Sequence, residues 1–173
     1  MNNLSRLPWK FIFISRLILI TLLYSGPATG AEVNCSLIKN ECEFYSCLET
    51  KKNCGKYGYP LGFGKKYCLL FEKREHKFSA SGNLFINKTR NCLIKTLLDS
   101  PKEVSCKALK RQAFKDHISC YIESGFCELS KSDKKNLYKI VWPTLWRGKV
   151  IRSGLKVKKH CWGLNRQENA AKK

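Results

Sequence analysis

Between residues 41 and 142 the apolar positions fall in five segments bounded by residues that start or end helices. No alternating run of apolar and polar residues is long enough to demand a β-sheet. Residues 147–160 mix Val, Ile and Leu with Lys and Arg, which is compatible with a helix or with irregular structure. The helices expected from this pattern cover residues 41–52, 65–78, 84–98, 101–124 and about 133–142.

Start and stop signals set the boundaries of these helices. Asn40 followed by Glu43 is a variant of the capping box, which opens the first helix. The run Ser100-Pro101-Lys102-Glu103 is the clearest start signal, because Ser favours the cap, Pro the first helical position, and Glu the position three residues after the cap. Gly125 ends this fourth helix, since glycine accepts the left-handed conformation at low cost.

Three weaker signals complete the pattern. The run 81–83, Ser-Gly-Asn, starts the third helix, and Ser132 or Asp133 caps the fifth. Pro143 breaks or kinks this fifth helix. Residues 56–64 are rich in glycine and contain a proline, so they are expected to form a loop.

Residues 1–30 have the composition of a secretory signal peptide. Arg6 and Lys10 precede an apolar run over 11–24, which ends in the small-residue stretch 25–30. The run is too short for a comfortable membrane span, so we expect cleavage after Gly30 and a secreted, extracellular protein. The expected organisation is a signal peptide over 1–30, one helical disulfide domain over 31–161 and a basic C-terminal tail over 162–173.

Ten cysteines separate this chain from an ordinary helical protein. Most intervals between them are seven or fourteen residues, and seven residues are almost two helical turns, so cysteines that share a helix point the same way. An even number of cysteines in an exported chain predicts disulfides. Zinc is disfavoured because Cys42 and Cys47 have no matching second pair. The expected fold class is therefore all-α, a single-domain antiparallel helical bundle stapled by disulfides.

Helix geometry excludes two cysteine pairs without naming the true partners. If one helix held Cys120 and Cys127, their Cα atoms would lie roughly 10 Å apart, whereas a disulfide needs roughly 4.4 to 6.8 Å. Cys42 and Cys47, five residues apart, would diverge by about 140° on a helix. Each of these cysteines therefore reaches another element.

Several motifs together resemble the stanniocalcin family. In that family Lys-Phe, three residues, Gly, two residues, Phe and six residues precede a Cys, and this chain has Lys77-Phe78-Ser79-Ala80-Ser81-Gly82-Asn83-Leu84-Phe85 before Cys92. The resemblance extends over about residues 35–161. The further matches are the segment from Cys42 to Cys47-Leu48-Glu49, the interval between Cys68 and Cys92, Cys120-Tyr121 followed by Cys127, and the long gap to Cys161.

The resemblance implies a disulfide pairing and a kind of function. It implies a secreted, hormone-like regulator that acts by binding another protein, a receptor or a protease, in calcium and phosphate homeostasis or as an inhibitor of an extracellular metalloproteinase. A covalent homodimer is not expected, because the further cysteine that links stanniocalcin subunits is absent. The implied pairs are Cys35–Cys47, Cys42–Cys68, Cys54–Cys106, Cys92–Cys120 and Cys127–Cys161.

Charge supports a second hypothesis. Residues 1–30 hold three of the 33 Lys and Arg and none of the 13 Asp and Glu, so the exported chain keeps 30 basic against 13 acidic residues, a net charge of +17. A basic patch near the C-terminus is interleaved with apolar residues and flanked by tryptophans, which suits a cationic effector that binds glycosaminoglycans or anionic membranes. A solvated basic face with tryptophans in the core is the other interpretation. The patch comprises Lys149, Arg152, Lys156, Lys158 and Lys159.

Enzymatic chemistry is not expected. Three Asp and three His are present, and none has a spacing typical of a catalytic pair. Glu72 with His76, and Asp116 with His117, are interpreted as solvated helix flanks. We expect no cofactor, no bound metal and no nucleic-acid partner. Asn87 begins a glycosylation sequon.

Overall fold

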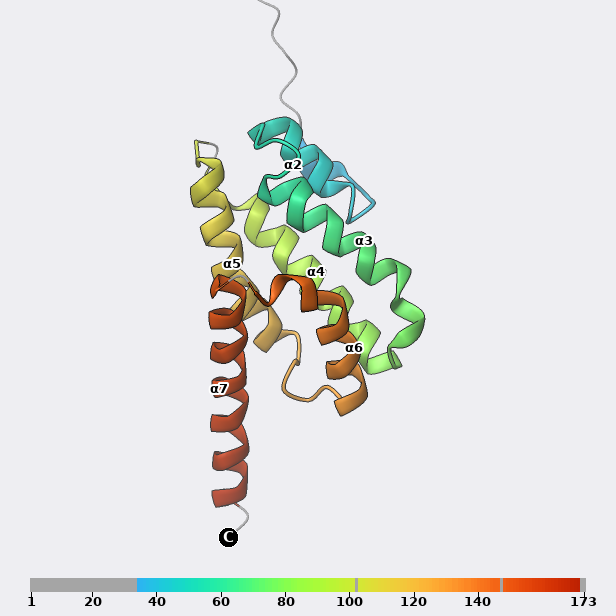
Figure 1. Cartoon of the computed structure of the whole chain (residues 1–173), viewed down its shortest axis with the longest axis vertical. Helices are drawn as coiled ribbons and strands as arrows, with labels where there is room; N and C mark the ends of the chain where they lie inside the picture. Colours follow the sequence, from blue (N-terminus) through green and yellow to red (C-terminus); the bar gives the residue numbers. More distant parts are fainter. Residues whose placement is uncertain (1–33, 102, 147, 172–173) are drawn as a thin grey trace, which may run out of the picture. The chain divides into compact units, whose positions relative to one another are not determined.

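The computed structural model describes residues 34–101, 103–146 and 148–171, and the expected signal peptide lies outside them. Within these ranges the chain is helical and has no strand, so the all-α expectation is confirmed (Figure 1). No helix among the described residues is long and apolar enough to cross a membrane. The main helices are α2 (Phe44–Lys52), α3 (Lys66–Lys73), α4 (Ala80–Leu98), α5 (Cys106–Glu123), α6 (Lys131–Val141) and α7 (Gly148–Ala171).

Five disulfides join these elements, and their pairing is the one that the stanniocalcin resemblance implies. The Cα atoms of the bridged pairs lie 5.2 to 5.6 Å apart, inside the range that a disulfide accepts. Cys120 lies in α5 and Cys127 beyond its end, so the two do not share a helix. The bridges are Cys35–Cys47, Cys42–Cys68, Cys54–Cys106, Cys92–Cys120 and Cys127–Cys161.

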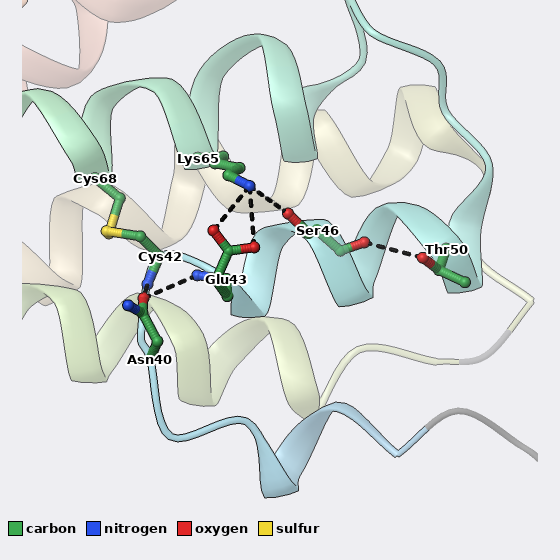
Figure 2. A network of polar contacts seen from close by, with 7 residues as sticks. All are labelled: Asn40, Cys42, Glu43, Ser46, Thr50, Lys65 and Cys68. Atoms are coloured by element: carbon green, nitrogen blue, oxygen red, sulfur yellow. Dashed lines mark hydrogen bonds and ion pairs between the residues drawn. A yellow bond between two sulfur atoms is a disulfide. The ribbon is translucent and has the colours of Figure 1, made fainter.

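Polar contacts fix the start of α2 (Figure 2). The Oδ1 atom of Asn40 accepts hydrogen bonds from the backbone N–H groups of Cys42 and Glu43, at 2.9 and 3.1 Å. The Lys65 ammonium lies 2.9 Å from the Glu43 carboxylate and donates to the Ser46 hydroxyl at 2.7 Å. The hydrogen bond from Lys65 lowers the pKa of Glu43 below its ordinary value. Asn40 thus caps the turn that leads into α2, and the helix itself begins at Phe44, three residues later than the sequence predicts.

The expected loop over 56–64 is wrong in its second half. Residues Pro60–Lys65 form a short π-helix, η2, that leads directly into α3. Pro60 occupies the first helical position, which proline tolerates. Gly64 serves close packing here, because a Cβ atom at this position would lie 2.3 Å from Cδ1 of the Tyr45 ring. Residue 64 is a glycine because the Tyr45 ring of α2 lies against its backbone, and not because the chain turns there.

Three helices begin at a different serine from the one expected. The side chains of Ser79, Ser105 and Ser130 each accept a hydrogen bond from a backbone N–H in the first turn of α4, α5 and α6. Ser100 does not cap α5, because its hydroxyl donates backward to the carbonyl of Leu97 in α4. Pro101 therefore lies in the connection between α4 and α5, although its neighbours form a good start signal.

A buried carboxylate ties the start of α4 to the start of α6. Asp133, only 1% exposed, accepts hydrogen bonds from the Ser79 backbone N–H (2.9 Å), the Ser79 hydroxyl (2.7 Å) and the Ser130 hydroxyl (2.7 Å). Gly82 leaves the space for this carboxylate, since a Cβ atom there would lie 2.6 Å from Asp133 Oδ1. The Gly82 position of the stanniocalcin-like motif therefore has a structural role at this junction.

The core is rich in aromatic rings. The Phe63 ring lies 4.8 Å from that of Phe114 and 4.7 Å from that of Tyr67, between centroids. His117 is half-buried among these rings, so its interpretation as a solvated flank is wrong. Desolvation lowers the pKa of His117 despite the contact of Nδ1 with the Ala113 carbonyl. Burial raises the pKa of Tyr121 to about 12.

Candidate functional site

The C-terminal basic patch lies on α7, a helix of 24 residues. Residues 162–171, expected as a tail, continue this helix. The side chains of Arg152, Lys156, Lys158 and Lys159 are all exposed, whereas that of Lys149 lies outside the described part of the structure. Arg152, Lys156 and Lys159 are four and three residues apart, so they share one face of the helix. The patch is therefore a row of solvated cations with Lys158 to one side.

An inner face holds α7 against α5 (Figure 1). Val157 is buried in the core, and the Ser153 hydroxyl donates to the Phe114 carbonyl of α5 at 3.3 Å. The Cys127–Cys161 disulfide adds a covalent attachment after the buried stretch. Beyond Cys161 the described side chains are exposed, so the last turns of α7 project without a covering neighbour.

The outer face of α7 carries apolar side chains among the cations. Ile151, Leu155 and Trp162 are 44%, 59% and 65% exposed. Intervals of four and seven residues place them in one stripe along the helix. The Arg166 guanidinium lies 5.2 Å from the centre of the Trp162 ring, a cation–π contact. The expected alternative of tryptophans buried in the core is wrong for Trp162.

A second basic and aromatic surface, on α6, was missed by the sequence analysis. Lys131, Lys135 and Lys139 are exposed and four residues apart, so they form a line along the outer face of α6. Tyr138 and Trp142 are exposed within this line. The ring of Trp146 lies 6.1 Å from that of Trp142 and is also exposed. The signal was present as a lysine every fourth residue, but only the buried position of Asp133 and Leu137 reveals which face meets water.

The glycosylation sequon lies in the middle of α4. Asn87 is exposed, whereas Thr89 is buried and its hydroxyl oxygen has no hydrogen-bond partner. Thr89 faces a cavity of about 80 Å³ lined largely by aromatic rings. Pockets for small molecules usually measure about 300 to 1,000 Å³. This cavity is therefore too small for such a ligand. Glycosylation of the exposed Asn87 stays a prediction.

Glu72 and His76, weighed as a possible pair, lie on different elements of the described chain. Glu72 lies at the end of α3, and His76 is exposed in the short 3-10 helix Glu75–Lys77. Among the described residues, ligand atoms of Cys42, Cys68 and Glu72 lie within 4.8 Å of one another. The two sulfur atoms form a disulfide, which removes the thiolates that a metal would need. The cationic and aromatic surfaces of α6 and α7 are thus the candidate binding sites.

No protein-family model, no curated protein and no solved structure matches this chain. Arguments about its function therefore rest on its residues and their geometry.

Proposed function

We propose that the chain is a secreted, stanniocalcin-like regulatory protein, without enzymatic activity, that acts by binding another extracellular protein. The observation that carries this proposal is the pairing of all ten cysteines. Ten cysteines can pair in many ways, and the five bridges here are those that the resemblance implies. A helical frame held by several disulfides keeps a rigid surface in the oxidising extracellular space.

The stanniocalcin-like motif supports the same proposal. Phe78 is buried, and Gly82 leaves room for the Asp133 carboxylate that joins α4 to α6. Both motif residues are therefore needed for packing. A short motif with such a role can be shared by proteins that have the same fold. A regulatory role in calcium and phosphate homeostasis, or in inhibition of an extracellular metalloproteinase, is what the resemblance adds.

Capture from the extracellular fluid of the source organism tests this proposal. The immobilised oxidised chain is exposed to the fluid at about 1 M salt, where the Debye length falls to about 3 Å and surface charges are screened. We expect saturable capture of one protein, with equal capture by the variant Arg152→Gln/Lys156→Gln/Lys159→Gln. The reduced and alkylated chain is the control, and it should capture no protein because its disulfides are broken. Capture that disappears at high salt or with added heparin would contradict the proposal.

A direct assay addresses the protease branch of the proposal. The oxidised chain is titrated into a purified pappalysin-type metalloproteinase, and cleavage of its substrate is measured. Inhibition that saturates at one chain per enzyme would identify the partner class. Undiminished cleavage at saturating chain removes this branch and leaves a receptor as the partner to be sought.

The exposed surfaces favour a second candidate function, a cationic secreted effector that binds acidic surfaces. Its support is the row of exposed cations on α7 and the exposed lysines of α6, with tryptophans beside both. Retention on a heparin column or on anionic vesicles, abolished by salt, would support this candidate. Passage through both without retention at low salt would end it.

A further inference from the structure

The outer face of α7 combines two features, an exposed apolar stripe and flanking positive charge. The first is the stripe formed by Ile151, Leu155 and Trp162, which is exposed to water over most of its length. Leaving large apolar side chains exposed in a row gives up the stabilisation that burial would provide. Val157 and Cys161 contact the core from a different side of the helix, and the exposure of Ile151, Leu155 and Trp162 shows that the described chain leaves the stripe uncovered.

The second feature is the placement of charge along this stripe. Arg152, Lys159 and Arg166 follow it on one side, at intervals of seven residues, and Lys158 lies on the other side. All four side chains are exposed. The sequence of α7 contains a single acidic residue, Glu168, near its end. The apolar stripe therefore lies between cations with almost no compensating negative charge.

We infer that the outer face of α7 is a docking site for a membrane surface with anionic phospholipid headgroups. In this arrangement α7 lies in the plane of the interface. Ile151 and Leu155 enter the boundary between headgroups and acyl chains, and Trp162 lies at the headgroup level. The flanking cations then meet lipid phosphates and carboxylates. The inference rests on the second candidate function and names the surface and the ligand class.

Two other occupants fit this face less well. A sulfated polysaccharide would pair with the cations but offers no hydrocarbon phase to Ile151 and Leu155. A second copy of the chain would place its own rows of cations against those of Arg152 and Lys159, and like charges across an interface oppose association. A lipid surface supplies negative charge and an apolar interior at once.

Vesicle flotation with the oxidised chain lacking residues 1–30 tests the inference. Vesicles of phosphatidylcholine alone are compared with vesicles that contain phosphatidylserine, at about 0.1 M salt. We expect binding to the anionic vesicles alone. Leu155→Ser should lower the partition coefficient about tenfold, because an exposed leucine no longer enters the apolar phase. Lys159→Gln should lower it about fivefold.

Matched controls separate these effects from general loss of apolar surface or charge. Leu84 of α4 is 55% exposed, close to the value for Leu155, but it lies outside α7. Leu84→Ser removes a similar exposed apolar side chain without changing the proposed docking face, so it should leave the partition coefficient unchanged. Lys73→Gln, at the exposed end of α3, is the corresponding charge control. Unchanged circular dichroism for each variant would show that folding is not the cause.

The remaining outcomes overturn the inference in distinguishable ways. Binding to heparin together with vesicle binding that Leu155→Ser does not change would refute docking by α7 while leaving the second candidate function intact. If the chain binds neither heparin nor vesicles, the inference and the second candidate function are both wrong. A wild-type dimer that Leu155→Ser converts to a monomer, measured by sedimentation equilibrium, would assign the face to self-association instead.

Discussion

At the scale of single residues, Asp133 and Gly82 show how two distant positions depend on each other. An oxygen of the Asp133 carboxylate lies 2.6 Å from the position that a Cβ atom of residue 82 would take. The carboxylate accepts hydrogen bonds from two helix-capping serines, Ser79 and Ser130. A buried carboxylate is costly unless it is hydrogen-bonded, so the three donors are a condition for its burial.

Asp133→Asn should lower the free energy of unfolding by about 2 kcal/mol. The amide keeps one oxygen for the Ser79 backbone N–H, but its NH₂ group cannot accept from the Ser79 and Ser130 hydroxyls, and hydrogen bonds to a charged group contribute about 1.5 to 3 kcal/mol. Urea unfolding of the oxidised protein at pH 7 measures the change. Asp99→Asn, at an exposed carboxylate, is the control and should change stability by less than about 0.5 kcal/mol.

The same residue makes stability depend on pH. Burial alone raises the pKa of Asp133, but the hydrogen bonds from Ser79 and Ser130 outweigh it, so its pKa in the folded protein lies below the ordinary value of 3.8. A lowered carboxyl pKa contributes stability above the unfolded pKa, which is lost as the pH falls through the folded pKa. The wild type and Asp133→Asn should therefore differ at pH 7 and converge at strongly acidic pH. If the wild type and Asp133→Asn differ in free energy of unfolding by the same amount at pH 7 and at strongly acidic pH, this assignment is wrong.

Gly64→Ala should destabilise the protein by about 2 kcal/mol or more. The new methyl group would overlap the Tyr45 ring, which is buried and cannot move aside without repacking. Gly154→Ala is the matched substitution, because nothing lies within 4 Å of its Cβ position in α7. That variant should gain up to about 1 kcal/mol from helix propensity. Equal midpoints for both in urea unfolding would show that contact with Tyr45 does not matter.

At the scale of elements, α7 differs from the other helices in how it is held. Its apolar contact with the core includes Val150 and Val157, and Cys161 ties it to the segment between α5 and α6. The helix then continues to Ala171 with its described side chains exposed. Such an element depends on its covalent attachment more than a helix that is packed on several sides.

Removal of that attachment should loosen α7 selectively. In Cys127→Ala/Cys161→Ala we expect amide hydrogen exchange to speed up more over 148–171 than over α4, because the bridge no longer restrains the opening of α7. Global stability should also fall by about 2 to 4 kcal/mol. Hydrogen-exchange mass spectrometry reads both regions in one experiment. Cys54→Ala/Cys106→Ala is the comparison, since its bridge does not include a residue of α7. Equal loosening of α7 in that variant would refute a local effect.

Helix boundaries show where reasoning from sequence reaches its limit. The run at Ser100 has the residues of a start signal, yet α5 begins after Ser105, because Ser100 donates to α4 and the Cys54–Cys106 bridge holds the first residue of α5. Local sequence offers several serines as caps, and tertiary contacts select one. The end at Gly125 was predictable, because a φ of 94° strongly favours glycine whatever surrounds it.

At the scale of the whole molecule, the helical frame is closed by five bridges and carries a large positive charge. The described part has no free cysteine, so its stability is coupled to the oxidation state of its surroundings. The charge destabilises the compact state through self-repulsion, and the cross-links oppose that effect.

Expression in a eukaryotic secretory host should yield a chain that begins at about residue 31 and has no reactive thiol before reduction. The physical reason is that an N-terminal apolar run with basic residues before it directs export, and disulfides persist in the oxidising compartment. N-terminal sequencing and thiol titration with and without reductant measure the two properties. A cell-retained chain that still carries residues 1–30, or thiols that titrate without reductant, would contradict it.

The sequence by itself determined the helical class, the presence of disulfides between elements and several helix ends, because these depend on local spacing and on single residues such as Gly125. The pairing of the cysteines was expected only from the stanniocalcin resemblance. It also identified the cations of α7, which charge alone makes visible. Only the tertiary structure decided which serines cap helices, why Gly64 and Gly82 lack side chains, and that Ile151 and Leu155 face water. These features depend on contacts between residues far apart in the chain, and no local pattern contains them.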